Sequence, residues 1–169
     1  MVCVLIVNDQ SLQRVGLRML LAAEPDLTVV GEAASGPEAV ALSAALRPDV
    51  VLMDSRLAEA DDIEAIQRIA QPPRLRPVSQ TAVTAMAEGS PPRVLVLASS
   101  AQERQAYAAL RAGAGGFLLT DAAPDELTAA VRVVASGDAV ITPALTRALI
   151  HAVREQPPAH PVEREAGLA

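Results

Sequence analysis

Short runs of mainly apolar residues alternate with longer segments in which apolar residues recur at helical spacing, and few folds accommodate this alternation. The runs are of strand length and cover residues 2–7, 27–31, 49–53, 93–97 and 116–119. Because polar residues do not occupy every second position, each strand is expected to be buried on both faces, as in a parallel sheet covered by helices. The sequence therefore predicts an α/β fold with a doubly wound, five-stranded parallel sheet.

The segments between these runs carry the start signals of helices. Ser35 stands three residues before Glu38, which is the spacing of a capping box, and Asp61 and Glu64 repeat it. Pro124 suits the first turn of a helix, where its missing N–H is not needed. The expected helices cover residues 11–24, 35–46, 61–70, 102–112 and 124–136, and a further helix is expected over 144–155.

The prolines help to divide the chain into parts. Residues 1–138 form the predicted domain, and within it residues 71–92 are an insertion that carries five of the 13 prolines. This insertion is far longer than the roughly 2–6 residues that usually join a helix to a strand, and its role stays open between a surface loop and a lid or partner-binding element. Residues 139–156 are predicted to be a linker helix, and residues 157–169 a Pro-rich tail.

Composition excludes several classes of function. Hydrophobic residues make up 51% of the chain, which is enough for a core, but no apolar run reaches the ~18 residues of a membrane span. With a formal charge of −6 and only two aromatic residues, Tyr107 and Phe117, this chain alone is a poor nucleic-acid binder. The single cysteine, Cys3, excludes a disulfide scaffold and fits a cytoplasmic protein.

The polar residues that end two of the strands are the first candidates for a site. Ligands of open α/β sheets bind at the carboxyl ends of the strands where the strand order reverses, which for the order 2-1-3-4-5 is between the first and third strands. The first strand ends in Asn8 and Asp9, and the third in Asp54. Two carboxylates at one edge repel each other unless a divalent cation lies between them, and oxygen ligands suit Mg²⁺. The alternative is that Asp9 and Asp54 only cap the helices that follow.

Six segments together resemble a known family. They are residues 4–9 (VLIVND), 16–21 (GLRMLL), 29–33 (VVGEA), 47–54 (RPDVVLMD), 93–97 (RVLVL) and 110–119 (LRAGAGGFLL). The set is similar to the receiver domain of bacterial two-component response regulators of the NarL/FixJ type, also called NarL/LuxR, over about residues 2–150. The resemblance implies a flavodoxin-like, CheY-like sheet of order 2-1-3-4-5 with flanking helices and a C-terminal linker helix, and a regulatory protein that is not an enzyme.

The resemblance also implies roles for individual residues in a phosphorelay. Asp54 falls on the position of the aspartate that accepts a phosphoryl group from a histidine kinase. Asp9 would be a metal-binding acid, and the backbone carbonyl of Arg56 would complete the Mg²⁺ site with Asp54. Phe117 falls on the aromatic residue that changes position when the domain switches.

Three positions in the phosphate pocket depart from the family pattern, besides Leu57-Ala58 in place of Met-Pro after the acceptor and Asp62 in place of a glycine. Asn8 replaces the first acid of a pair, Ala98 the hydroxyl residue at the end of strand four, and Thr120 the lysine after strand five; the chain contains no lysine at all. Asn8 removes a negative charge, so Mg²⁺ binding is expected to be weak or absent. A charged hydrogen bond contributes about 1.5–3 kcal/mol. Losing the contacts at Ala98 and Thr120 therefore removes roughly 3–5 kcal/mol of the free energy by which a phosphoryl group favours the active conformation. Driving a switch from 1:99 to 99:1 takes about 5.5 kcal/mol.

These departures predict a degenerate receiver, or pseudo-receiver, in an atypical transcription regulator that phosphorylation does not drive. Its input is expected to be a small molecule or protein partner at the rim formed by Asn8, Asp54, Ala98 and Thr120. Two alternatives stay open: a conventional phosphorelay receiver phosphorylated on Asp54, and a constitutive dimerisation module. A homodimer is expected in each case, through the first and fifth helices or the fourth and fifth.

The tail adds one clue about output. Residues 161–165 (PVERE) are similar to the opening of the helix-turn-helix domain that follows the linker helix in NarL-type regulators. The resemblance implies that DNA is bound through an output domain beyond the residues of this chain.

Overall fold

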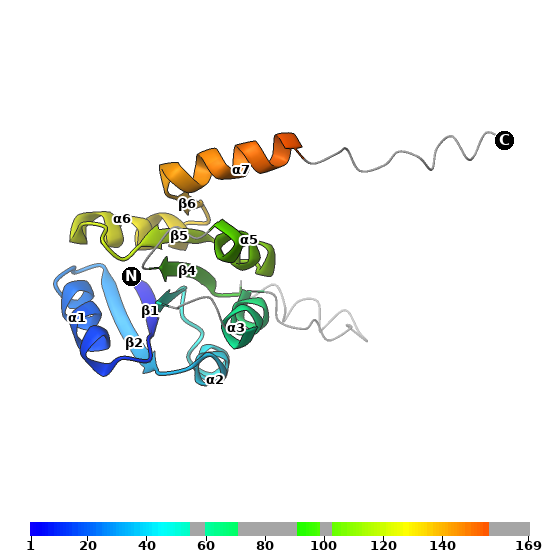
Figure 1. Cartoon of the computed structure of the whole chain (residues 1–169). Helices are drawn as coiled ribbons and strands as arrows, with labels where there is room; N and C mark the ends of the chain where they lie inside the picture. Colours follow the sequence, from blue (N-terminus) through cyan, green and yellow to red (C-terminus); the bar gives the residue numbers. More distant parts are fainter. Residues whose placement is uncertain (55–59, 71–90, 99–102, 156–169) are drawn as a thin grey trace, which may run out of the picture.

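The computed structural model describes residues 1–54, 60–70, 91–98 and 103–155, and these residues build a parallel sheet between two layers of helices (Figure 1). Within the described residues the sheet has six strands in the order β2-β1-β3-β4-β5-β6. The strands are β1 (Val2–Val7), β2 (Leu27–Ala33), β3 (Val50–Asp54), β4 (Arg93–Ala98), β5 (Gly116–Leu119) and β6 (Val140–Ile141). The predicted flavodoxin-like class and the order of the first five strands are confirmed, because every neighbouring pair is parallel.

The prediction of five strands is wrong by one edge strand. β6 consists of two residues, and Val140 and Ile141 pair with Gly116 and Phe117 of β5. A two-residue strand shows no periodicity that a sequence pattern could reveal. The linker segment therefore begins with an extension of the sheet before its helix starts at Pro143.

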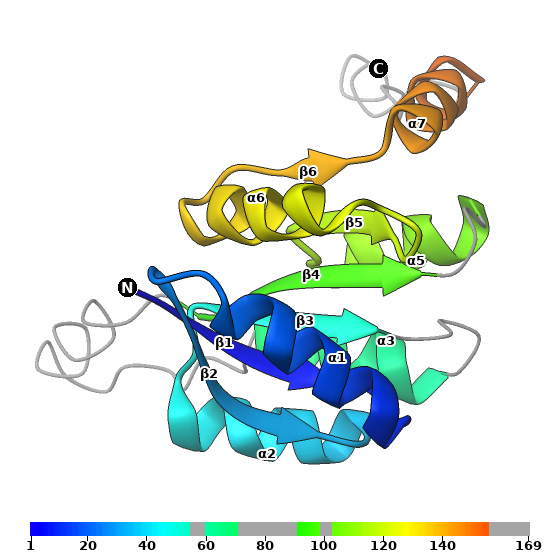
Figure 2. The same ribbon diagram turned by 90° about the vertical axis from the view of Figure 1, so that its left-hand side faces the viewer.

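The helices lie on both faces of the sheet, and α1 and α6 share one face while α2, α3 and α5 share the other (Figures 1 and 2). Their bounds are α1 (Ser11–Ala22), α2 (Gly36–Leu46), α3 (Ala60–Ala70), α5 (Glu103–Ala112), α6 (Pro124–Ala135) and α7 (Pro143–Glu155). These bounds agree with the sequence pattern to within two residues, which is the ordinary uncertainty of a helix end.

Of the two predicted capping boxes, the first is confirmed. The Ser35 hydroxyl accepts a hydrogen bond from the Glu38 N–H at 3.3 Å, and the Glu38 carboxylate reaches back to the N–H of Ala34 at 3.1 Å. The second box is not tested, because the residues before Ala60 lie outside the described ranges and Asp61 lies one residue inside α3.

The strands are buried on both faces, as their apolar composition requires. Val4 and Ile6 of β1 pack on the face of α1 and α6, whereas Leu5 and Val7 pack on the face of α2, α3 and α5. Phe117, the only phenylalanine, is 0% exposed in the second of these two cores. The sheet is therefore a rigid base for the side chains at its carboxyl edge.

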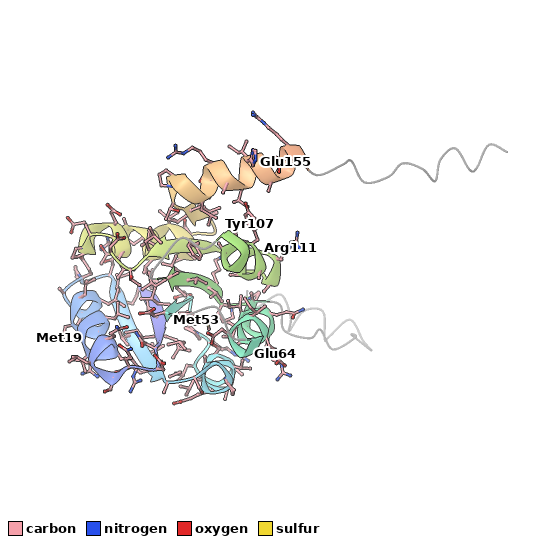
Figure 3. All side chains as sticks on the ribbon, in the orientation of Figure 1. Met19, Met53, Glu64, Tyr107, Arg111 and Glu155 are labelled. Carbon is pink, nitrogen blue, oxygen red and sulfur yellow. The ribbon has the colours of Figure 1, made fainter. Side chains whose placement is uncertain are left out.

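Helix α7 docks on α5. Leu145 is 1% exposed, Leu149 packs against the same core, and the Tyr107 hydroxyl of α5 donates a hydrogen bond to the Ala148 carbonyl at 2.9 Å. Figure 3 shows Tyr107 at the junction of the two helices. The last described helix is thus anchored to the sheet layer by apolar burial and one side-chain hydrogen bond.

Three sequence predictions concern residues that are not described. Residues 71–90 of the insertion, residue 56 and the tail from residue 156 lie outside the described ranges. Among the helices that are described, none combines the length and the apolar character that crossing a membrane requires.

Candidate functional site

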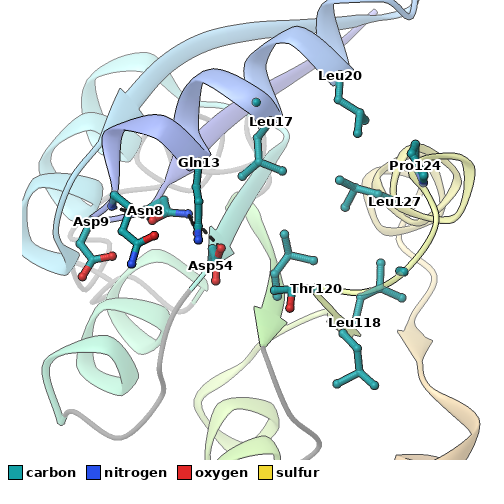
Figure 4. Close-up of a pocket in the computed structure, with 15 residues that line it drawn as sticks. Asn8, Asp9, Gln13, Leu17, Leu20, Asp54, Leu118, Thr120, Pro124 and Leu127 are labelled. Carbon is teal, nitrogen blue, oxygen red and sulfur yellow. Dashed lines mark hydrogen bonds between the residues drawn. The ribbon is translucent and has the colours of Figure 1, made fainter.

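Asn8 and Asp54 meet at the carboxyl edge of the sheet because their strands are neighbours. Val7, the last residue of β1, is the register partner of Met53 in β3, so the next residue of each strand reaches the same edge. Asn8 is 2% exposed and Asp54 is half-buried. Figure 4 shows both side chains at one end of a pocket.

The orientation of the Asn8 amide is fixed by the backbone. Its Oδ1 accepts a hydrogen bond from the Gln10 N–H at 2.8 Å, and a backbone N–H can only donate. Nδ2 must therefore face the opposite way, where it donates to Asp54 Oδ2 at 2.9 Å and to Gln13 Oε1 at 2.8 Å. Both amide hydrogens are used, so Asn8 is a fully satisfied buried polar group that binds the Asp54 carboxylate.

This arrangement fits a magnesium ion poorly. Mg²⁺ is held by oxygen ligands, but Asn8 presents its N–H groups to Asp54 and turns its oxygen toward the Gln10 amide. Within the described ranges, no three histidine, cysteine, aspartate or glutamate side chains are grouped so that they could hold a metal. An oxygen of Asn8 could face Asp54 only if the amide turned over and the hydrogen bonds to Gln10 and Asp54 broke.

The two other substituted positions lie on the neighbouring strands. Ala98 ends β4 and is 5% exposed, and its carbonyl accepts a hydrogen bond from the Thr120 N–H at 2.8 Å. Thr120 follows β5, is exposed, and lines the same pocket as Asn8, Asp9 and Asp54. The methyl group of Ala98 belongs to the core that contains Phe117, so it packs as an apolar side chain.

The pocket extends well beyond the polar residues. Its volume is about 540 Å³, and from Asp54 it runs along the gap between α1 and α6 (Figure 4). Leucines and small residues form most of its wall and floor: Gly16, Leu17, Leu20, Leu97, Leu118, Leu119, Ala122, Pro124 and Leu127. The site is therefore a polar end joined to an apolar groove.

A cluster of charges closes the other end of the gap between α1 and α6. Arg132 of α6 binds Asp26 at 2.8 Å and Glu24 at 2.9 Å, and both acids follow α1. The Arg132 guanidinium, mainly through its hydrogen bond, holds the pKa of the Asp26 carboxyl below its ordinary value, while Asp26 and Glu24 raise the pKa of Arg132. This ion-pair clamp joins the two helices at the amino edge of the sheet, opposite Asp54.

Comparison with known proteins decides the family. Residues 4–132 match the sequence profile of the response regulator receiver domain. This chain belongs to the response regulator receiver domain family. Receivers of this kind are regulatory and are not enzymes.

Relatives and solved structures place the receiver near the NarL/LuxR group. It is 31% identical to the nitrate/nitrite response regulator NarL of Escherichia coli over 89% of the chain, and 34% identical to the transcriptional regulatory protein LiaR of Bacillus subtilis over 82%. It spans 62% and 58% of these two regulators, or about three fifths of their length.

Among solved structures, a LuxR-family two-component response regulator from Aurantimonas superposes with a TM-score of 0.72 at 27% identity, covering 92% of this chain and 99% of that one. The signal receiver domain of a NarL regulator from Mycobacterium tuberculosis gives 0.64 at 32% identity, covering 80% and 97%.

The receiver brings together most of the residues that the sequence singled out. Asn8, Asp9, Asp54 and Thr120 line one pocket, whereas the Ala98 side chain is turned into the core and Phe117 lies buried beside it. The sequence did not reveal the role of Gln13, which holds the Asn8 amide from the first turns of α1. It also did not reveal the apolar groove, because the spacing of Leu17 and Leu20 is that of ordinary core leucines.

Proposed function

We propose that this receiver regulates transcription through a DNA-binding output domain, and that phosphorylation of Asp54 is not its input. The observation that carries the proposal is the hydrogen bond from Asn8 Nδ2 to Asp54 Oδ2 at 2.9 Å. The alternative input is a small molecule or protein partner that binds the pocket beside Asp54.

The first step of the argument concerns the transfer of a phosphoryl group. A carboxylate attacks phosphorus with an oxygen lone pair, and cations around the site must offset the negative charge of the phosphoryl oxygens. Here an amide N–H already stabilises one Asp54 oxygen, and no arginine or histidine is among the described residues that line the pocket. Mg²⁺ binding is proposed to be weak at best, so the described residues of the pocket give the transfer little electrostatic support.

The second step concerns the response to a phosphoryl group. A hydroxyl at the end of β4 would hydrogen-bond a phosphoryl oxygen, but Ala98 offers only a buried methyl group. Thr120 offers a neutral hydroxyl where a lysine would form an ion pair. Each lost charged hydrogen bond removes about 1.5–3 kcal/mol of bias, so even a phosphorylated Asp54 would shift the conformation little.

Output is proposed to pass through α7. This helix is anchored by Leu145 and by the hydrogen bond from Tyr107, and it leads toward the tail that resembles the start of an output domain. The relatives include a transcriptional regulatory protein, and they extend beyond the part that this chain matches. The complete regulator is proposed to act on DNA in the cytoplasm.

A homodimer is also part of the proposal. Helix α1 exposes Leu12, Val15 and Met19, whose spacing places them on one face of the helix, with 81%, 37% and 67% of their surfaces accessible. Figure 3 shows Met19 at the outer side of α1. Such an apolar stripe beside the pocket is typical of an interaction surface. The surface of α1 is therefore the proposed contact between two receivers.

The test is a titration with beryllofluoride and Mg²⁺, which mimics a phosphoryl group on aspartate. Phe117 is the only phenylalanine, so fluorine-labelled phenylalanine gives a single NMR signal from the core next to Ala98. We expect no saturable shift of this signal or of the Asp54 amide. Saturation in the micromolar to low-millimolar range would instead establish a conventional phosphorelay receiver.

A positive control comes from restoring the three departures together. The triple variant Asn8→Asp, Ala98→Thr, Thr120→Lys regains the acid, hydroxyl and ammonium groups, and we expect it to show a saturable beryllofluoride response. Acetyl phosphate labelling gives a second readout. Labelling of the wild type but not of Asp54→Asn would favour a conventional phosphorelay receiver that accepts a phosphoryl group on Asp54.

A further inference from the structure

The groove between α1 and α6 is an unfilled apolar space inside the layer of helices. Leu97 and Leu118 form its floor and are only 4% and 7% exposed, Leu17 stands on the α1 side, and Leu127 stands on the α6 side. Atoms that line a gap lack packing partners on one side, so filling the gap with apolar atoms is favourable. The groove therefore favours an apolar occupant.

The hollow has an identifiable cause in the sequence. Gly16 of α1 lines the groove, and a Cβ added there would have no atom of the described structure within 4 Å. Ala122, between β5 and α6, contributes only a methyl group on the opposite side. The ion-pair clamp of Arg132 holds the two helices together at the far end, so they are linked there without filling the space near Asp54.

Size selects the kind of occupant. Sites for small molecules usually have volumes of about 300–1,000 Å³, lined mainly by apolar side chains with a few polar groups. The volume of about 540 Å³ lies inside this range, and the pocket opens at the strand-order switch point, where α/β sheets bind ligands. A small organic molecule fits these dimensions, whereas a folded partner does not enter such a groove.

Charge selects the chemistry of the polar end. Asp9 is exposed at the mouth and carries a negative charge, Thr120 adds a hydroxyl, and the described residues that line the pocket include no cation. An anionic ligand is therefore repelled, while a molecule that presents an N–H or O–H group is attracted. The pocket therefore favours a molecule with an apolar part for the groove and an uncharged hydrogen-bond donor for the polar end.

We infer that the pocket binds a small, mainly apolar organic molecule whose uncharged end donates a hydrogen bond toward Asp9 at the mouth. Its apolar part lies in the leucine-lined groove between α1 and α6. This inference rests on the proposed function, in which the input is not a phosphoryl group, and it names the class of ligand that replaces it.

Two dyes form a matched pair of probes. N-phenyl-1-naphthylamine is uncharged, has one N–H donor, and becomes fluorescent in an apolar environment. 8-Anilinonaphthalene-1-sulfonate has the same rings and the same N–H but adds a sulfonate anion. We expect saturable fluorescence with the uncharged dye at micromolar concentrations. We expect the receiver to bind the sulfonate dye at least about tenfold more weakly.

Variants locate the binding and test its charge selectivity. A Cβ at Gly16 meets no atom of the described structure within 4 Å, and leucine favours a helix more than glycine does. We therefore expect Gly16→Leu to extend into the groove and to weaken binding of the uncharged dye about tenfold or more while the fold is kept. The matched control is Ala41→Leu, which adds the same side chain to an exposed position of α2 on the opposite face of the sheet. Asp9→Asn should reduce the difference between the affinities for the two dyes, because it removes one negative charge that repels the sulfonate.

Three results would overturn the inference: no saturable binding of the uncharged dye, equal affinity for both dyes, or equal binding by Gly16→Leu and Ala41→Leu. The titration with beryllofluoride separates this inference from the proposed function. If the dye fails and beryllofluoride also fails, only the ligand class is wrong. If beryllofluoride saturates while the dye fails, both proposals are wrong.

Discussion

Replacing Asn8 by aspartate tests the central hydrogen bond of the site most directly. The side chain keeps its size, and one oxygen still accepts the hydrogen bond from the Gln10 N–H. The second oxygen takes the place of Nδ2, where the wild-type distances to Asp54 Oδ2 and Gln13 Oε1 are 2.9 and 2.8 Å. The hydrogen bond to Asp54 therefore becomes a contact between two like charges, whereas the Gln13 amide can turn over and donate its own N–H to the new carboxylate.

The size of the penalty follows from simple electrostatics. Two unit charges that relax to about 4 Å apart repel by about 4 kcal/mol at an effective dielectric constant of about 20. Protonating one carboxyl group instead costs about 4 kcal/mol at pH 7, because an ordinary aspartate titrates near pH 3.9. Since Asp54 is half-buried and partly screened by water, we expect Asn8→Asp to lower the free energy of unfolding by about 2–4 kcal/mol.

The penalty should depend on pH and on Mg²⁺. The folded variant holds a proton more tightly than the unfolded chain, so its stability relative to wild type is highest below about pH 4 and falls as the pH rises. A divalent cation removes the repulsion, and at a concentration a hundred times its Kd it restores about 2.7 kcal/mol. The free energy of unfolding of the wild type should depend less on pH and on Mg²⁺ than that of the variant.

Urea unfolding at pH 7, with and without Mg²⁺, measures both effects. The matched control is the double variant Asn8→Asp, Asp54→Asn, which exchanges the two side chains and allows an amide to donate to a carboxylate again. It should recover most of the lost stability and should not respond to Mg²⁺. If Asn8→Asp is as stable as wild type in the absence of Mg²⁺, the amide does not stabilise Asp54 as we argue.

Three further substitutions test contacts elsewhere. Arg132→Gln removes the group that lowers the pKa of the Asp26 carboxyl, so its melting temperature should lie below wild type at pH 7 and converge with it as the pH falls below about 4; parallel curves would contradict this. Tyr107→Phe removes a hydrogen bond of about 1 kcal/mol to Ala148 and should speed amide exchange in α7 about fivefold, with no such change in β1. Leu145→Ala should lower the free energy of unfolding by about 2–5 kcal/mol in urea; a loss below about 1 kcal/mol would mean that α7 does not share the core.

The fold could be predicted because the sequence repeats one strong signal. Each of the first five strands is a nearly continuous apolar run, and such runs separated by amphipathic segments leave little choice besides a parallel sheet with two helix layers. The signal failed where the element was too short to carry it, as for β6.

The site could be predicted only as far as topology determines it. Parallel strands bring Asn8 and Asp54 to one edge whatever their side chains do, so their proximity followed from the sequence. Which way the Asn8 amide turns depends on Gln10 and Gln13, two residues of a helix start that carried no recognised motif. The groove depends on the separation of α1 and α6, and apolar spacing does not distinguish a leucine that packs from one that lines a gap.

The three departures from the family pattern form one consistent arrangement rather than three separate losses. Because Asn8 is neutral and donates to Asp54, its amide supplies part of the stabilisation that an ammonium at position 120 would otherwise give to the carboxylate. Ala98 is buried at 5% exposure, where a hydroxyl without a phosphoryl partner would lose hydrogen bonds to water. Each single reversion therefore places a polar or charged group in a site that lacks its partners. Only the triple variant supplies acid, hydroxyl and ammonium together, so the response to beryllofluoride should appear in it and not in any of the single variants.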